Sequence, residues 1–327
     1  MRSFVTPKFT ITARTLELVA SVSEKIGAVN ALFLNKIPEK TKSEYLINSV
    51  YSTLVLDDVI INKSFISNIL SNNSADNCNN DNLEFIALQN TVAAYKNIGH
   101  WHPYSLSSLL SAHESLMEGI SKTAGKIRTE SVGLKLYRNK IQTAPDPGKL
   151  EYLLENLFSY VKTSRDLLLI RCCVFYYELM FIRPFDTGNG RMARLWFKVL
   201  LNEYNSVLGS ISLETLMLAQ KQAMHDVLSR CIRTGKSTLF IEFVLGIIDS
   251  ALGNLLKEPA PVITVEDRIR AFQNGFVPEI FSRKDYMLFF KNISTATASR
   301  DLQFATENGI INKTGDKNQA VYRFRVK

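Results

Sequence analysis

The chain has 327 residues, of which 46% are hydrophobic and 21% are charged, and its formal net charge is +8. This composition indicates an ordinary globular protein with room for two domains. No apolar block opens the N-terminus, and Glu242 and Asp249 interrupt the most apolar later stretch, so we expect no signal peptide, no membrane span and a cytoplasmic location.

The cysteines are too few and too irregularly spaced to predict a disulfide or a metal site. They form no CxxC pair, and two of the four are adjacent. We therefore expect reduced, mostly buried thiols at Cys78, Cys172, Cys173 and Cys231.

Most of the chain is predicted to be helical. We assign 1–44 to an N-terminal helical region and 45–257 to an all-α core domain with an exposed loop at 71–82. Helical periodicity marks five core segments: 105–120, 148–164, 165–182, 192–205 and 213–231. The third is apolar on all sides, which predicts a central helix. Residues 131–142 alternate instead and predict a short hairpin or flap.

A second domain is expected after the proline-containing linker at 258–264. In 265–327, capping residues and apolar spacing predict three helices and then two short strands, the element order of a winged helix-turn-helix. From Thr264 to Lys327, eleven Lys/Arg residues outnumber seven Asp/Glu residues, which is half of the chain's positive excess. This imbalance favours an anionic partner.

The segment FIRPFDTGNGRMAR, 181–194, has the features of a phosphate site. Its Gly188-Asn189-Gly190 turn leads into a helix, so that backbone N–H groups and a helix N-terminus face an anion. Arg191 and Arg194 lie three residues apart and share one helix face. Two guanidinium groups beside such a turn suit a di- or triphosphate.

This segment resembles the signature of the Fic (Fido) family, HxFx[D/E]GNGRxxR, and AGKIR followed by SVGLK is similar to the family's approach to its target flap. The resemblance implies a mostly α fold: a Fic-type helical core with a short β flap, here joined to a winged-helix domain. It also implies binding of ATP and transfer of AMP to a hydroxyl group of a target protein. The matching positions are the motif anchor Phe185 and the nucleotide-binding residues Gly188, Asn189, Gly190, Arg191 and Arg194.

Two motif positions depart from the family. Arg183 replaces the histidine base, and because arginine stays protonated it cannot accept the hydroxyl proton. Losing such a base typically costs ~10²–10⁴-fold in rate. Thr187 replaces the acidic Mg²⁺ ligand and offers at most a neutral hydroxyl, while Asp186 stands one place early. ATP or a related nucleotide thus remains the implied ligand, with poor support for Mg²⁺.

Two interpretations of Arg183 stay open. It could contact nucleotide phosphates in the place of Mg²⁺, so that the site binds nucleotide without metal and without turnover. Alternatively, it caps the carbonyls of the preceding helix and the pocket is empty. Among the histidines, we expect His113 to be packed in the core, and His225 lies where the family often has a tyrosine near the active site.

Thr53 to Asp58, TLVLDD, resembles the family's inhibitory pattern [S/T]xxxE[G/N], with Asp57 in place of the glutamate. The resemblance implies that Asp57 pairs with Arg194 and blocks the γ-phosphate position; the alternative is an acidic pair on a solvated helix face. The resemblance also implies a target flap that adds a strand to the target's backbone, and its alternative is a structural hairpin. The flap residues are Val132, Gly133, Leu134, Lys135, Leu136 and Tyr137.

The third helix and the wing of the C-terminal domain carry the residue types that contact phosphates and base edges. Asp301 and Glu307 dilute this charge, so DNA binding and protein docking stay open. The DNA-binding candidates are Thr295, Thr297, Ser299, Arg300, Gln303, Lys313 and Lys317.

The sequence therefore favours a nucleotide-binding protein related to protein AMP-transferases, with weak or no transferase activity and a regulatory or signalling role. Two alternatives remain: an active protein adenylyltransferase, and a DNA-binding regulator whose core acts as a sensor or scaffold. The target protein and the oligomeric state, a homodimer included, are not determined by the sequence.

Overall fold

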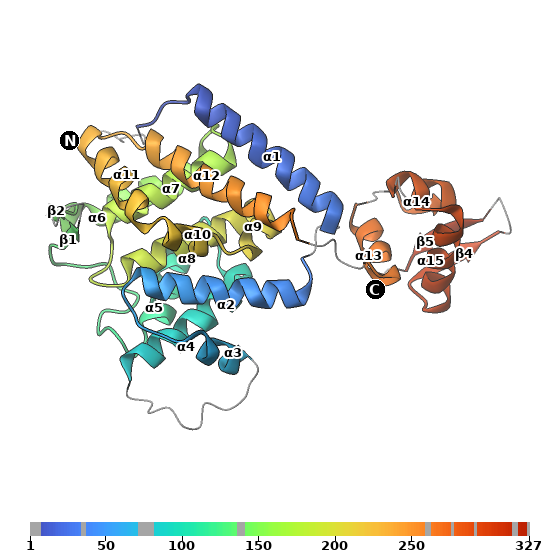
Figure 1. Ribbon diagram of the computed structural model, residues 1–327, viewed down its shortest axis with the longest axis horizontal. Helices are drawn as coiled ribbons and strands as arrows, with labels where there is room; N and C mark the ends of the chain where they lie inside the picture. Colours follow the sequence, from blue (N-terminus) through green and yellow to red (C-terminus); the bar gives the residue numbers. More distant parts are fainter. Residues whose placement is uncertain are drawn as a thin grey trace. The chain divides into compact units, whose positions relative to one another are not determined.

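The computed structural model describes residues 8–33, 37–70, 82–135, 141–258, 263–275, 278–290, 293–315 and 320–325 (Figure 1). The chain divides into two compact units, one formed by 1–28 with 37–258 and the other by 29–36 with 259–327. The predicted loop tip at 71–81 with Cys78, and the flap residues Leu136 and Tyr137, lie outside the described residues.

The first unit is a helical bundle built around α7 (Leu168–Ile182), as its all-round apolar sequence predicts. Ten of its fifteen residues are buried, and it packs against α6, α8 and α12. Cys172 and Cys173 in this helix, and Cys231, are buried free thiols. The surrounding helices are α1 (Ala13–Phe33), α2 (Glu39–Leu56), α3 (Lys63–Leu70), α4 (Leu83–Lys96), α5 (Leu106–Met117), α6 (Leu150–Thr163), α8 (Asn189–Tyr204), α9 (Ser206–Ser210), α10 (Leu213–Ala219), α11 (Lys221–Thr234) and α12 (Thr238–Leu255), with 3₁₀ turns η1 (Ile98–His100) and η3 (Pro147–Lys149).

The single helix expected over 213–231 is wrong, because the chain breaks at Gln220 between α10 and α11. Gln220 has φ −114° and ψ 27°, which lie outside the helical range. Its N–H still bonds to Leu216 O, and its carbonyl accepts from the N–H of Met224. The i to i−4 hydrogen bonds therefore continue on both sides of Gln220, although one helix ends and the next begins there. Because the spacing of apolar residues stays nearly helical, the sequence does not reveal the break.

The expected core boundary at residue 45 falls inside α2, and most of α1 groups with the core. Figure 1 shows α1 and α12 side by side. α1 buries an apolar face that includes Leu18, Val22 and Ile26. Polar contacts with α12 add to it: Thr12 Oγ1, just before α1, donates to Glu242 at 2.5 Å, and Lys25 Nζ lies 2.6 Å from Asp249. By length and composition α12 would suffice for a membrane span, and half of it is buried within the unit. The two acids that interrupt its apolar sequence thus have polar partners in and beside α1.

The predicted hairpin consists of β1 (Gly133–Lys135) and β2 (Ile141–Thr143). The strands pair antiparallel, with Leu134 opposite Gln142. The amide of Ala144 donates to Val132 O at 3.0 Å and extends the pairing by one step.

The C-terminal unit has the element order expected of a winged helix, with one additional strand. Its helices are α13 (Val265–Gly275), α14 (Arg283–Phe289) and α15 (Thr295–Glu307), and its strands are β3 (Ile280–Ser282), β4 (Ile311–Thr314) and β5 (Val321–Phe324). The sheet is antiparallel in the order β3-β5-β4. The sequence did not predict β3, because three residues are too short to show a period of two.

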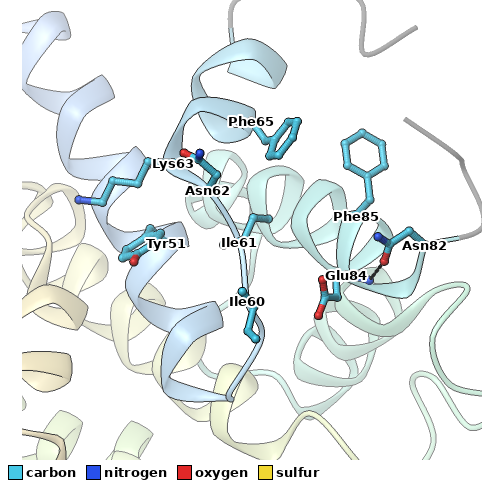
Figure 2. A pocket seen from close by; sticks show the side chains of 9 residues that line it. All are labelled: Tyr51, Ile60, Ile61, Asn62, Lys63, Phe65, Asn82, Glu84 and Phe85. Atoms are coloured by element: carbon cyan, nitrogen blue, oxygen red, sulfur yellow. Dashed lines mark hydrogen bonds between the residues drawn. The ribbon is translucent and has the colours of Figure 1, made fainter. Parts of the chain in front are cut away.

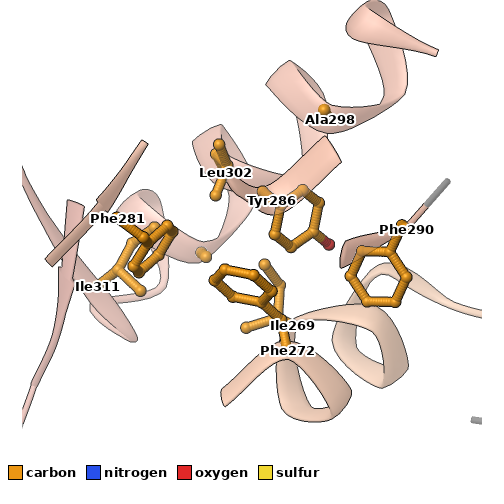
Figure 3. Close-up of a cluster of buried hydrophobic side chains, with 9 residues drawn as sticks. Ile269, Phe272, Phe281, Tyr286, Phe290, Ala298, Leu302 and Ile311 are labelled. Carbon is orange, nitrogen blue, oxygen red and sulfur yellow. The ribbon is translucent and has the colours of Figure 1, made fainter. Parts of the chain in front are cut away.

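The core of this unit is aromatic (Figure 3). Phe272 of α13 makes edge contacts with Phe281 and Tyr286, with ring centroids 4.7 and 4.9 Å apart. Ser282 forms a capping box with Asp285 at the start of α14, and Ser294 caps α15. These local signals place α14 and α15 as the sequence predicts.

Candidate functional site

The turn between α7 and α8 is fixed by its own side chains. Phe185 is fully buried, and Asn189 accepts its N–H at 3.0 Å and donates to its carbonyl at 2.6 Å. Asn189 therefore uses both polar ends of its side chain to close the turn. The predicted nucleotide-binding role at this residue is left to the backbone.

Helix α5 forms the floor of this turn. The ring of His113 stacks on Phe185 with centroids 3.5 Å apart, and its Nδ1 accepts the N–H of Gly125 at 3.0 Å. Because Nδ1 is an acceptor, Nε2 carries the proton and donates to Thr187 O at 3.1 Å. Burial lowers the pKa of His113 to about 4. The expectation of a packed histidine agrees with this geometry, and with both nitrogens bonded His113 cannot act as a replacement base.

The start of α8 offers backbone donors to an anion. Gly188 precedes the helix with φ 73°, and the first turn of any α-helix has N–H groups without intrahelical acceptors. A Cβ at Gly190 would lie 2.9 Å from Asp57 Oδ1 and 3.2 Å from an Arg194 nitrogen. Glycine at this position keeps open the space that faces the charged groups.

The end of α2 brings an acid to both motif arginines. Asp57 accepts from Arg191 Nε at 2.9 Å and from Arg194 Nη2 at 2.6 Å. Arg194 also donates to Thr53 Oγ1 at 2.7 Å and to Thr53 O at 3.0 Å. Thr53 and Asp57 are thus brought together with Arg194, and Asp57 also bridges to Arg191, a contact that the sequence analysis missed.

This cluster is deeply placed and strongly polarised. Arg194 is 4% exposed and Arg191 7% exposed. Burial raises the pKa of Asp57, but the guanidinium groups of Arg194 and Arg191 outweigh it and hold the pKa below its usual value. Asp57 is therefore a carboxylate at neutral pH, and its single negative charge offsets one of the two positive charges of the arginines.

Asp58 follows Asp57 in the left-handed conformation, with φ 61°. Glycine and asparagine adopt this conformation most readily, which fits the small residue of the family pattern. The exposed Asp58 accepts from Lys221 Nζ at 2.8 Å. His225, one turn further along α11, has its pKa lowered by burial and by Lys221.

Arg183 ends α7 in the left-handed conformation, with φ 48° and ψ 66°. Its Nε is buried and has no hydrogen-bond partner among the described residues. Burial and the Arg128 cation lower the pKa of Arg183, while the Asp57 carboxylate raises it. Arg183 therefore lies within electrostatic reach of Asp57.

The carbonyls at the end of α7 are capped by a different arginine. Arg128 Nε donates to Arg183 O at 2.7 Å, and Arg128 Nη2 lies 3.5 Å from Ile182 O. The capping role considered for the Arg183 side chain is thus performed by Arg128. This leaves Arg183 available for another partner.

The residues at the predicted metal position do not form a carboxylate site. Asp186 is exposed and accepts from Thr123 Oγ1 at 2.8 Å. Thr187 is exposed, and its carbonyl is taken by His113. Within the described ranges no group of three or more His, Cys, Asp or Glu residues could hold a metal ion.

Of the flap residues, Val132 is half-buried and Gly133 is exposed, while Leu134 and Lys135 belong to β1. In the described part of the chain the hairpin is a two-stranded sheet, so β1 has one edge without a partner strand.

The C-terminal unit brings four of the seven predicted DNA-binding residues into one groove of about 990 Å³. Asp301, which the sequence analysis counted against DNA binding, is fully buried and bonded to Arg268 and Tyr286. Thr297 lies at the cap of α15, Arg300 is exposed, and Lys317 is outside the described residues. The residues that line the groove include Thr295, Ser299, Gln303 and Lys313, with Arg283 and Lys284 beside them.

A separate open cleft of about 790 Å³ lies between α2, α3 and the start of α4 (Figure 2). Its lining is mixed, and none of the motif residues belongs to it. The lining residues are Tyr51, Ile60, Ile61, Asn62, Lys63, Phe65, Asn82, Glu84 and Phe85. The sequence contained no signal for this cleft.

Comparison with known proteins agrees with the geometry. Residues 103–201 match the Fic/DOC family. The whole chain is similar to a Fic family protein from Desulfovibrio desulfuricans G20, with 25% identity, a TM-score of 0.74 and coverage of 98% of this chain and 99% of that one.

Two other solved structures share the fold over about three quarters of this chain. Fic-1 from C. elegans has 19% identity and a TM-score of 0.54, with 74% of each chain covered. A Fic domain containing signaling protein from Bacteroides thetaiotaomicron VPI-5482 has 12% identity and a TM-score of 0.58, covering 73% of this chain and 97% of that one. The chain therefore carries a Fic/DOC family domain over 103–201 within a Fic-type helical fold.

Proposed function

We propose that this protein binds a nucleotide through its phosphates at the start of α8, and that it has weak or no AMP-transferase activity. The supporting observation is that two buried guanidinium nitrogens of the motif, Arg183 Nε and Arg191 Nη1, have no partner among the described residues and lie on one turn. Buried charged donors without acceptors are costly, so this arrangement favours an anionic ligand. The helix N-terminus beside them offers further donors.

The phosphate charge is neutralised by arginine in this proposal, without a metal. The residues at the metal position do not fit Mg²⁺, because Asp186 bonds to Thr123 and Thr187 offers no carboxylate. Arg183 supplies a permanent positive charge on the same turn. It cannot accept a proton from a target hydroxyl, which is why transfer is expected to be weak or absent.

Asp57 competes with the phosphates for the two motif arginines. Its carboxylate already takes one hydrogen bond from Arg191 and one from Arg194. A phosphate group must displace it to reach both cations, so we assign an inhibitory role to Thr53 and Asp57. Binding without turnover would suit a regulatory or signalling protein.

The direct test is calorimetric titration with ATP in EDTA and in Mg²⁺, on wild type, Arg183→Ala and the control Arg171→Ala. Arg171 donates to Val161 O at the end of α6, away from the motif, and its Nε is also buried without a partner among the described residues, so it controls for the loss of such a group outside the turn. We expect equal affinity with and without Mg²⁺, and at least about tenfold weaker binding when Arg183 loses its charged donors. Binding that requires Mg²⁺, or that ignores Arg183, contradicts the proposal.

Transferase activity is tested separately with ATP labelled on its α-phosphate. The samples are wild type, Asp57→Gly, and the repaired variant Arg183→His with Thr187→Asp, made with and without Asp57→Gly. If only the repaired proteins become labelled, the fold can still support AMP transfer and the natural protein has lost that activity. Label on wild type or on Asp57→Gly favours the alternative of an active protein adenylyltransferase.

Target recognition by strand addition rests on the open edge of β1. Main-chain hydrogen bonds along such an edge accept many side-chain sequences, so a target protein would be recognised mainly by its backbone. Crosslinking from a photoreactive group at Gly133 tests whether a partner protein docks there.

A second candidate function is DNA binding by the C-terminal unit. Arg283, Lys284 and Lys313 line the groove, and Glu307 is the one acid among the described residues that line it. Asp301 adds no surface charge, since it is internal and paired with Arg268. Cations and hydroxyl groups in a groove beside a helix and a wing suit the phosphates of a duplex.

The DNA candidate is tested by anisotropy of labelled duplex DNA at several salt concentrations. Each DNA phosphate that the protein neutralises adds about 0.9 to the steepness of log K against log salt. We expect Lys284→Ala and Lys313→Ala each to make this dependence shallower, whereas the exposed Arg270 on α13, outside the groove, serves as the control. A slope that responds equally to Arg270→Ala would mean that DNA is not bound in this groove, and the absence of DNA binding would favour protein docking instead.

A further inference from the structure

A single buried guanidinium joins three segments near the site. Arg128 is 2% exposed, and its side-chain hydrogen bonds to the described residues go to backbone carbonyls. Nη1 donates to Glu130 O and Nη2 to Pro145 O, each at 2.6 Å, in addition to the bond from Nε to Arg183 O. Carbonyl oxygens are thus the hydrogen-bond partners of this cation among the described residues. Burial lowers the pKa of Arg128, and the Asp186 and Asp146 carboxylates offset part of this effect.

These carbonyls have particular places in the fold. Glu130 precedes β1 and Pro145 follows β2, so Arg128 holds both ends of the hairpin. The third carbonyl belongs to Arg183, directly after α7, and the amide of Arg128 also donates to Pro184 O at 2.9 Å. The base of the flap and the start of the phosphate turn are therefore fixed to one another through one side chain.

The contact with Arg183 bears on its conformation. A residue with a side chain rarely adopts φ near 48°, because Cβ is crowded there. If the Arg183 carbonyl turned in another direction, the 2.7 Å hydrogen bond from Arg128 Nε would break. The left-handed conformation in turn determines where the Arg183 guanidinium is directed.

We propose that Arg128 is a positioning residue: it holds Arg183 in the left-handed conformation that directs its guanidinium toward the phosphate turn, and it fixes the flap to the same end of α7. Its effect on ligand binding acts through Arg183 and rests on the proposed function. Its effect on the flap does not.

The first test is a double-mutant cycle with ATP in EDTA as the probe. Lysine keeps the charge at 128 but lacks the planar fork that reaches three carbonyls. We expect Arg128→Lys to weaken binding about tenfold in wild type, as the loss of a charged hydrogen bond does, and less than about twofold in the Arg183→Ala background. Arg171→Lys is the matched control, since Arg171 also donates to a helix-end carbonyl. Equal weakening in both backgrounds overturns the positioning role.

The second test is amide hydrogen exchange, which needs no ligand. The reporters are the amides of Arg128, Ala144 and Arg183, and the control is the amide of Ser164, which bonds to Tyr160 O. We expect Arg128→Lys to accelerate the three reporters together by about tenfold or more and to leave Ser164 unchanged. Acceleration of Arg183 without Ala144 overturns the link to the flap.

The two tests separate the possible failures. If wild type does not bind ATP, the proposed function fails and the exchange experiment still decides the role of Arg128. If Arg128→Lys does not fold, exchange in wild type decides it, because the proposal requires the three reporters to open with one common free energy. Independent opening of the three amides refutes it.

Discussion

Removal of the Asp57 carboxylate is the perturbation that most directly tests the arrangement of the two motif arginines. Asp57 accepts one charge-assisted hydrogen bond from Arg191 and one from Arg194. A hydrogen bond to a charged group contributes about 1.5–3 kcal/mol, so a phosphate that displaces Asp57 forgoes at least about 3 kcal/mol. Asp57→Ala removes this competition, and ATP should bind at least about 100-fold tighter.

The same change should destabilise the ligand-free protein. Removing one partner of a buried pair costs about 3–5 kcal/mol, because the remaining charges are left without a counterion. Two buried guanidinium groups then face each other, and the phosphates of ATP restore the missing negative charge. Asp57→Ala should therefore melt below wild type without ATP and gain more stability than wild type when ATP is added.

Calorimetry and thermal melting in EDTA measure both effects. The control is Asp58→Ala, which removes the adjacent, exposed acid and its bond to Lys221. It should change ATP affinity less than about twofold, as expected for a surface ion pair. If Asp57→Ala binds ATP no better than wild type, the phosphates do not occupy the two arginines and the reasoning fails.

Three further predictions concern stability. His113 has a pKa lowered by burial from 6.5 to about 4, so unfolded chains bind a proton that the folded protein does not, and stability should fall by about 3 kcal/mol as pH drops from 6.5 to 4. In urea titrations, His113→Gln should lack this part of the loss of stability at low pH. A variant whose stability depends on pH as in wild type would contradict the burial of His113. Burial raises the pKa of Glu178 to about 7, so the charged form is disfavoured in the folded protein and stability is lost as pH rises from 4.5 through 7. Glu178→Gln should accordingly raise the melting temperature at pH 8 but not at pH 4, and an equal effect at both would point to packing. Asp301→Ala should destabilise the C-terminal unit by about 3–5 kcal/mol, because Arg268 and Tyr286 lose a fully buried partner. Faster hydrogen exchange of the α13 amides would report this loss of stability. Amides in Asp301→Ala that exchange as slowly as in wild type would refute the prediction.

Much of the fold follows from local patterns. The apolar sequence of α7 predicts its central place, and Ser282 and Ser294 mark the starts of α14 and α15, because periodicity and capping act within a few residues. The break at Gln220 and the short β3 could not be predicted in this way. The break at Gln220 leaves the helical spacing of apolar residues unchanged, and β3 is too short to show the alternation typical of a strand.

The motif shows the same division. The sequence alone identifies the GNG turn, the two arginines and the replacement of a base by Arg183, since these are properties of residue type and spacing. It cannot tell that Asn189 is consumed in closing the turn, or that Arg128 caps α7 and leaves Arg183 available for a ligand.

Apart from the pair of Asp57 with Arg194, which the family resemblance implied, charge pairing over long separations was decided by the tertiary structure. Asp57 lies 134 residues before Arg191, yet one carboxylate bridges Arg191 and Arg194, and Asp301 disappears from the surface because Arg268 reaches it from another helix. Residue types and spacing determine which charges are present and on which helix face they stand. Whether a given charge is exposed, neutralised or left with an unpaired donor depends on which helices pack together, and only the folded chain determines that.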